Sequence, residues 1–288
     1  MGRLFKAFIF KVRRDITFRI TLIVGAGIAV FMTILYFILQ VALKDQLAQG
    51  YPGYDIKMLT GPNMLLNSFS PVQNFGIAIP VNLISFTCLE FTQGTIRNKI
   101  IAGNSKFKIY ASLYLTGLIF AFAMLLVYAG ICTALGSIFG GFDLKQVATL
   151  PSGQYAFANG TFILKYLVLV VMAYLSIVSF AIFMATAFRN IGPCIPIVMV
   201  TLMLCYLSVA ILANIKNVDT TGVNTVLKII NPLYAISGGA ETTAALPTEI
   251  GNAYIPNDTL IAAIINNIFY GAAFFAAGSL LFKKRDVK

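Results

Sequence analysis

Six long apolar runs dominate this 288-residue sequence. Hydrophobic residues make up 59% of the chain and charged residues only 11%, whereas a soluble domain carries about 25% charged residues. So few charged side chains cannot cover a water-facing surface, and lipid must therefore solvate much of the chain. Six runs have the length of transmembrane helices, at residues 20–43, 72–89, 109–139, 162–188, 191–213 and 259–282. We expect an all-α integral membrane protein in which residues 1–288 form a single transmembrane domain.

The basic residues are distributed unevenly between the two sides that six spans define. An even number of spans puts both chain ends on one side, which collects 15 of the 21 Lys and Arg residues and 3 of the 10 acidic residues. The other side has 6 basic and 7 acidic residues. Because cytoplasmic loops are enriched in Lys and Arg, both termini are expected in the cytoplasm. The net charge of +11 is then a topology signal, and we expect the bilayer rather than nucleic acid as the partner.

Residues 1–19 have the pattern of an amphipathic helix that precedes the first span. One side of a helical wheel collects the apolar residues Leu4, Phe5, Phe8, Ile9, Val12 and Ile16, and the other side collects Arg3, Lys6, Lys11, Arg13 and Arg14. Such a helix is expected to lie in the cytoplasmic leaflet with its cations near lipid phosphates. The alternative is a charged leader that only orients the first span.

The segment between the second and third spans predicts a short helix. Gly94 interrupts the second span, Thr95 is a suitable N-cap, and Gly103 stands where a helix commonly ends. On this helix Ile96 and Ile100 share a face, with Ile101 beside them. An apolar stripe in an aqueous loop needs a covering surface, either the lipid headgroup region or a partner protein.

Glu90 ends the otherwise apolar second span. An ionised group costs about 2.5 to 3.5 kcal/mol at the centre of a bilayer and less toward its edge, so this carboxylate needs a partner. The N-terminal dipole of the short helix and the guanidinium of Arg97 are the two partners we expect. The alternative is a solvated carboxylate at the membrane boundary.

The order of Glu90, the residues 94–99 (Gly-Thr-Ile-Arg-Asn-Lys), Gly103 and a Lys-rich stretch resembles the signature of ABC type-2 permeases, the membrane subunits of ABC exporters, and above all their small bacterial members. The resemblance implies that residues 95–102 form a coupling helix that docks into a groove of an ATPase subunit, with Glu90 fixing its angle to the second span. The coupling residues would be Glu90, Gly94, Thr95, Ile96, Arg97, Asn98, Lys99, Ile100 and Ile101. It also implies short re-entrant helices between the last two spans, where an apolar piece at residues 226–237 is broken at Asn231-Pro232.

Several kinds of chemistry are missing from the sequence. The chain has no histidine, which excludes His-based triads and His-containing zinc or haem sites. It has no phosphate-loop motif, so ATP and Mg²⁺ are expected on a separate ATPase chain, with no cofactor or metal on this one and no enzymatic activity of its own. The four cysteines stand in apolar runs and are interpreted as buried hydrophobic residues.

Polar residues inside the spans are the candidates for a translocation pathway. Asn74, Asn82 and Ser85 lie on one face of the second span, and Asn266 and Asn267 are adjacent in the sixth. Amides in lipid must face water or form hydrogen bonds across helices, so these positions mark either a pathway or a helix interface.

The leading hypothesis is therefore the permease subunit of an ABC exporter in a bacterial cytoplasmic membrane. Two copies, or one copy with a second permease, would form the pathway as a homodimer or heterodimer. We expect the substrate to be a toxic peptide or a drug. The alternatives are a stand-alone channel or secondary carrier and, third, a membrane scaffold or enzyme without transport activity.

Overall fold

A computed structural model describes residues 2–14, 16–50, 59–69, 78–142, 148–149, 155–158, 160–214, 221–234, 252–253, 255 and 257–285. Within these residues the chain is helical apart from three short strands. The elements in chain order are α1 (Gly2–Arg14), α2 (Ile16–Gly50), α3 (Gly61–Phe69), α4 (Ala78–Thr92), α5 (Thr95–Ile101), α6 (Lys106–Gly140), β1 (Ala148–Thr149), β2 (Tyr155–Ala158), α7 (Gly160–Phe188), α8 (Ile191–Asn214), α9 (Thr221–Ile230), β3 (Asn252–Ala253) and α10 (Asn257–Lys284).

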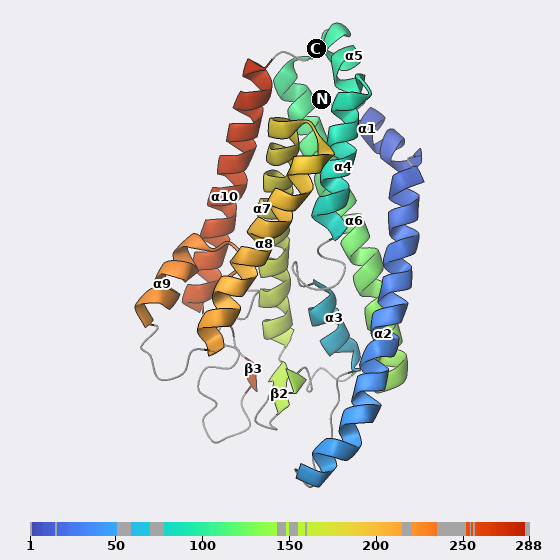
Figure 1. Ribbon diagram of the computed structural model, residues 1–288, viewed down its shortest axis with the longest axis vertical. Helices are drawn as coiled ribbons and strands as arrows, with labels where there is room; N and C mark the ends of the chain where they lie inside the picture. The colour runs from blue at the N-terminus through green and yellow to red at the C-terminus, as the bar shows by residue number, and fades with distance from the viewer. Residues whose placement is uncertain are drawn as a thin grey trace.

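The long helices run roughly side by side, and α7 lies at the centre of the bundle (Figure 1). Helix α7 packs against α10, α4, α8 and α6. Both chain ends and α5 lie at one end of the bundle, which we call the terminal face; the strands lie toward the other end. Among the described residues, five helices are long and apolar enough to cross a membrane: α2, α6, α7, α8 and α10. The chain is thus a predominantly helical, multi-pass membrane protein, as the apolar runs predicted.

The strands were not predicted and lie in the segments that connect the helices. Strand β2 pairs with β1 in antiparallel and with β3 in parallel orientation. This small sheet joins the segment after α6 to the segment before α10.

The second predicted span differs from the sequence prediction. Helix α4 has 15 residues and begins at Ala78, so residues 72–77 of the predicted span lie outside the described residues. At 1.5 Å per residue α4 is about 22 Å long, less than the roughly 30 Å of a hydrocarbon layer. A further helix, α3, precedes it and packs against α6 and α7. In Figure 1 α3 lies below α4, farther from the terminal face.

Helix α3 is held by close contacts with the far end of α6. The peptide N–H of Gly61 donates to the carbonyl of Gly141 at 3.0 Å. A methyl group added at Gly140 would overlap the backbone carbonyl of Leu59, and one added at Gly136 would meet the side chain of Met64. Small residues in α6 therefore let the chain around α3 approach its backbone.

Helix α1 includes most of residues 1–19, for which the sequence predicted an amphipathic helix. The exposed side chains include Lys6 and Arg14, whereas Phe8 is fully buried in the core that α4, α5 and α6 share. The protein itself therefore covers this part of the apolar face, which we had expected in the lipid leaflet.

Helix α9 ends at Ile230, directly before the predicted break at Asn231-Pro232. The amide of Asn231 donates to the carbonyl of Cys205 in α8 at 2.6 Å, and its side-chain oxygen accepts the peptide N–H of Leu233 at 2.9 Å. These bonds attach the turn after α9 to α8. Residues 235–237 of the predicted apolar piece lie outside the described residues.

Candidate functional site

The connection from α4 to α5 depends on a glycine in the left-handed conformation. Gly94 has φ 65° and occupies the N-cap position of α5, where its carbonyl accepts the peptide N–H of Asn98 at 3.0 Å. Side chains other than glycine rarely adopt this conformation without strain. The prediction that Thr95 is the N-cap was wrong, because Thr95 is already the first helical residue and its hydroxyl turns back toward α4.

The other end of α5 agrees with the prediction. Gly103 has φ 82°, and its peptide N–H donates to the carbonyl of Ile100 at 2.9 Å. The amide of Asn104 donates to the carbonyl of Lys99 at 3.0 Å. A left-handed glycine after the last turn satisfies helix carbonyls that would otherwise lack donors.

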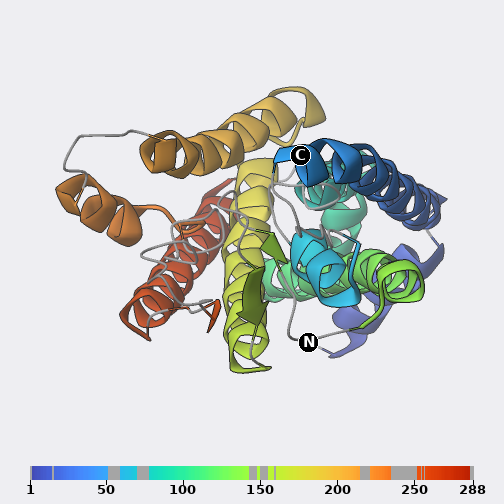
Figure 2. The same ribbon diagram turned by 90° about the horizontal axis from the view of Figure 1, so that it is seen from below.

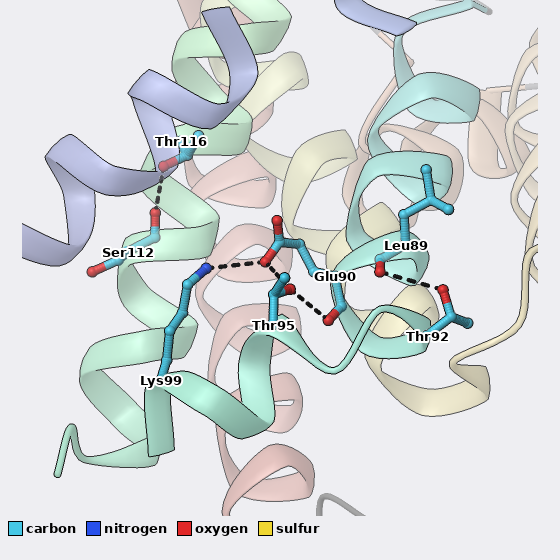
Figure 3. Close-up of polar contacts among 7 residues, drawn as sticks. All are labelled: Leu89, Glu90, Thr92, Thr95, Lys99, Ser112 and Thr116. Carbon is cyan, nitrogen blue, oxygen red and sulfur yellow. Dashed lines mark hydrogen bonds and ion pairs between the residues drawn. The ribbon is translucent and has the colours of Figure 1, made fainter. Parts of the chain in front are cut away.

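Glu90 lies at the centre of the site and is fully buried (Figure 3). One of its carboxylate oxygens accepts the hydroxyl of Thr95 at 2.6 Å and lies 3.0 Å from the ammonium of Lys99. The Thr95 hydroxyl also lies 2.9 Å from the backbone carbonyl of Glu90. Two side chains of α5 thus hold the last turns of α4, and the alternative of a solvated Glu90 does not apply.

The prediction that Arg97 pairs with Glu90 was wrong, and the geometry of the helix explains why. Thr95 and Lys99 are four residues apart and differ by only about 40° around a helix, whereas Arg97 is rotated from Thr95 by about 200°. The side chains of Thr95 and Lys99 point to Glu90 of α4 (Figure 3). Arg97 is exposed.

Lys99 also connects the site to α1. Its ammonium lies 3.1 Å from the centroid of the buried Phe8 ring, and 18% of its side chain is exposed. A cation over an aromatic face is attracted by the ring quadrupole, and more strongly where water is excluded. Lys99 therefore joins α1, α4 and α5.

The apolar residues of α5 are divided between the core and the surface. Ile96 is fully buried and Ile100 half-buried, both packed into the hydrophobic core, whereas Ile101 is 73% exposed. The chain itself covers Ile96, so this residue needs no external surface. The exposed side of α5, formed by Arg97, Asn98 and Ile101, is named here the α5 outer face.

Other contacts fasten the surrounding helix ends at the terminal face. The ammonium of Lys106 donates to the carbonyls of Lys283 and Arg285, each at 3.1 Å, and Arg285 donates to the carbonyl of Ala187. Arg189 has φ 56°, and its guanidinium lies 5.4 Å from the centroid of the Phe91 ring. These contacts link the ends of α4, α7 and α10 and the start of α6 at the terminal face.

The candidate pathway residues of the second span form hydrogen bonds within the bundle. The Asn82 side-chain oxygen accepts the hydroxyl of Thr21 in α2 at 2.8 Å, and its amide donates to the carbonyl of Ala78. The hydroxyl of Ser85 donates to the carbonyl of Val81 at 2.9 Å. Asn74 lies outside the described residues.

The two asparagines of α10 contact neighbouring elements. The amide of Asn266 donates to the carbonyl of Lys228 in α9 at 2.6 Å. Asn267 is 2% exposed; its oxygen accepts the hydroxyl of Ser176 in α7 at 2.7 Å, and its amide donates to the carbonyl of Pro232 at 2.9 Å. These contacts support the helix-interface alternative at this position.

The described residues hold no group of three or more Cys, Asp or Glu side chains that could bind a metal. Cys88, Cys132 and Cys194 are buried and Cys205 is half-buried, all as free thiols.

Comparison with known proteins gives one match. A family model described as "Protein of unknown function (DUF2705)" matches residues 72–288. No curated protein matches the chain. No solved structure matches it either.

Proposed function

We propose that this chain, which belongs to the DUF2705 family, is the membrane subunit of an ATP-driven exporter of the ABC type-2 class. Its ATP and Mg²⁺ would be bound by a separate ATPase subunit. The observation that carries the proposal is the α5 outer face, an exposed patch that includes a large aliphatic side chain, on a helix fixed to α4 through the buried Glu90. Arg97 and Ile101 together offer one cationic and one apolar contact to a groove of another protein.

The contacts of Glu90 provide a route for mechanical coupling. A force applied to α5 acts on α4 through Thr95 and Lys99, because both side chains bind the same carboxylate oxygen. Lys99 extends this connection to α1 through Phe8. Docked ATPase subunits that close on ATP would thereby tilt α4 and α1 together.

The remaining parts of the proposal concern placement and partners. The terminal face would lie in the cytoplasm of a bacterium, with the plasma membrane around the five long helices and α4 as the sixth span, preceded by α3. Helix α9 would re-enter the outer leaflet. A homodimer or a heterodimer with a second permease would enclose the pathway, and we propose a toxic peptide or drug as the substrate.

The test first searches the genes that neighbour the gene of this chain for a phosphate-loop ATPase and then co-expresses that ATPase with the chain. We expect Arg97→Glu and Ile101→Asp to abolish co-purification of that ATPase while the permease still inserts into the membrane. Both positions are exposed, so neither change should disturb the fold. Lys284→Glu is the matched control, because it reverses an exposed charge on the same face outside α5.

Co-purification that survives both changes in the α5 outer face would overturn the docking proposal. Loss of co-purification with the Lys284→Glu control as well would point to a general charge effect and would also contradict a specific role for α5.

A second candidate function is a stand-alone secondary carrier. Its support is the arrangement of α3 and α4, two helices placed in succession along the bundle, of which only the second falls within a span predicted from the sequence. Discontinuous helices often form the substrate sites of secondary transporters. Solute movement by the purified chain in liposomes without any ATPase would favour this candidate over the exporter.

A further inference from the structure

A cavity of about 220 Å³ lies between α7, α8, α10 and the turn after α9. In Figure 2, α8, α9 and α10 lie on one side of the central helix α7. The cavity is partly open to the surroundings. Its walls include the apolar side chains of Ile177, Phe180, Leu202, Leu233 and Phe274.

The cavity lies deep along the spans. Leu202 stands half-way along α8 and Tyr270 half-way along α10, and both line it. The middle of α10 is about 20 Å from either end of that helix. Because a hydrocarbon layer is about 30 Å thick, the cavity opens within the acyl-chain region, which excludes water.

Hydrogen bonds fix the turn that forms one wall. Asn231 binds α8 through the carbonyl of Cys205 at 2.6 Å and the hydroxyl of Ser208 at 3.2 Å. On the opposite side, Asn267 of α10 donates to the carbonyl of Pro232 at 2.9 Å. The turn is thus held by both neighbouring helices, so the cavity has a defined shape.

Two of the three hydroxyl groups in the lining, those of Ser176 and Thr201, form hydrogen bonds within the protein. The hydroxyl of Ser176 donates to the side-chain oxygen of Asn267 and lies 2.8 Å from the carbonyl oxygen of Ala173, and Thr201 donates to the carbonyl of Ile197. The ring of Tyr270 stacks on Phe274, with centroids 6.1 Å apart. A ligand at this site therefore meets mainly carbon atoms and van der Waals contacts.

We propose that this cavity binds an acyl chain of a phospholipid from the surrounding bilayer. An apolar cavity of about 150 Å³ is enough to hold benzene, so this cavity can accept a segment of a hydrocarbon chain. Phospholipid chains end near the bilayer centre, at the depth of Leu202 and Tyr270. A chain held there contacts Leu233 and so supports the turn after α9.

The absence of tryptophan from the sequence permits a local fluorescence test. Phe274→Trp places the only indole in the cavity wall. Phe269→Trp is the matched control, because Phe269 is 66% exposed on the same helix and about 7 Å away along its axis. Each variant of the full chain is reconstituted into vesicles of phospholipid brominated on its acyl chains, which quench indole fluorescence on contact.

Both indoles should be quenched in these vesicles. When detergent with excess unbrominated phospholipid disperses the bilayer, quenching should persist for Phe274→Trp and be lost for Phe269→Trp. Equal loss of quenching in the two variants overturns the proposal. The measurement needs no ATPase, so its outcome is independent of the proposed exporter function.

A filling substitution gives a second test in the Phe274→Trp background. Thr201→Phe adds a ring at the cavity wall and should remove the persistent quenching. Leu204→Phe adds a ring on the same helix at a position that is 61% exposed and should leave it unchanged. Quenching that persists with Thr201→Phe would contradict the proposed acyl-chain site. If that variant fails to fold, the comparison of Phe274→Trp with Phe269→Trp tests the proposal by itself.

Discussion

The ammonium of Lys99 lies 3.1 Å from the centroid of the Phe8 ring and is also bound to the buried Glu90. This contact joins residues that are 91 positions apart in the sequence. It ties the first helix of the chain to the short helix α5, so the two cannot move independently without losing a buried contact.

The first prediction concerns the charge balance at Glu90. Lys99→Met should destabilise the protein more than Glu90→Gln. The first change removes a cation bound to a carboxylate that has no exposed surface, and removing one partner of a buried pair costs about 3 to 5 kcal/mol. The second leaves Lys99, whose side chain is 18% exposed and can turn to water. Thermal unfolding in detergent gives the melting temperature of each variant. Equal melting temperatures would contradict the finding that Glu90 is more deeply buried than Lys99.

The second prediction separates the role of Glu90 in assembly from its role in coupling. Glu90→Gln keeps a side chain that can accept the Thr95 hydroxyl but loses the ion pair with Lys99. If α4 moves with α5 through this pair, ATP-driven export should fall while ATPase co-purification stays. Export at the wild-type rate would remove the proposed role of Glu90.

The third prediction tests the contact of Lys99 with Phe8. Phe8→Leu keeps an apolar side chain but removes the ring face, which should cost about 2 kcal/mol for a desolvated cation–π contact. Phe10→Leu is the control, since Phe10 is 57% exposed with Arg14 over its ring, and exposed pairs contribute about 0.5 to 1 kcal/mol. A larger loss of thermal stability for the Phe10 variant would be inconsistent with the structure.

Local sequence signals predicted α5 well but not its tertiary contacts. Gly94 and Gly103 marked the helix because both are left-handed positions that its ends require. The partner of Glu90 was missed because Thr95 was assigned to a cap, which hid that Thr95 and Lys99 share one face. The contact with Phe8 gave no local signal, since it depends on where α1 packs.

Helix α3 was missed for a different reason. Its nine residues are too few for a membrane span, and Asn63, Asn67 and Ser68 interrupt its apolar residues. Its stability depends on long-range contacts, such as the hydroxyl of Tyr166 that donates to the carbonyl of Leu66 at 3.1 Å. The surface of α6 that it packs against carries Gly136 and Gly140, four positions apart, a spacing of small residues that is typical of close helix contacts.

The fourth prediction tests that close approach. Gly140→Ala should destabilise the protein by about 1 to 3 kcal/mol, the usual range for overpacking, because the added methyl group meets the backbone of Leu59. Gly130→Ala lies on the same helix with nothing within 4 Å of its added methyl group, so it should be neutral or slightly stabilising. Unfolding curves of the two variants that coincide would show that the chain around α3 does not pack so tightly on α6.

The fifth prediction decides between an interface and a pathway role for Asn267. As an interface residue, Asn267 should be sensitive to replacement by Leu, because the change removes bonds to Ser176 and Pro232. Interhelical hydrogen bonds in membranes contribute about 0.6 kcal/mol each and at most about 1.7 kcal/mol, so the expected loss is about 1 to 2 kcal/mol. Thermal unfolding measures that loss, and a Ser176→Ala variant should show part of it. A pathway residue would behave in the opposite way: Asn267→Leu would alter transport of one solute relative to another while the melting temperature stayed the same.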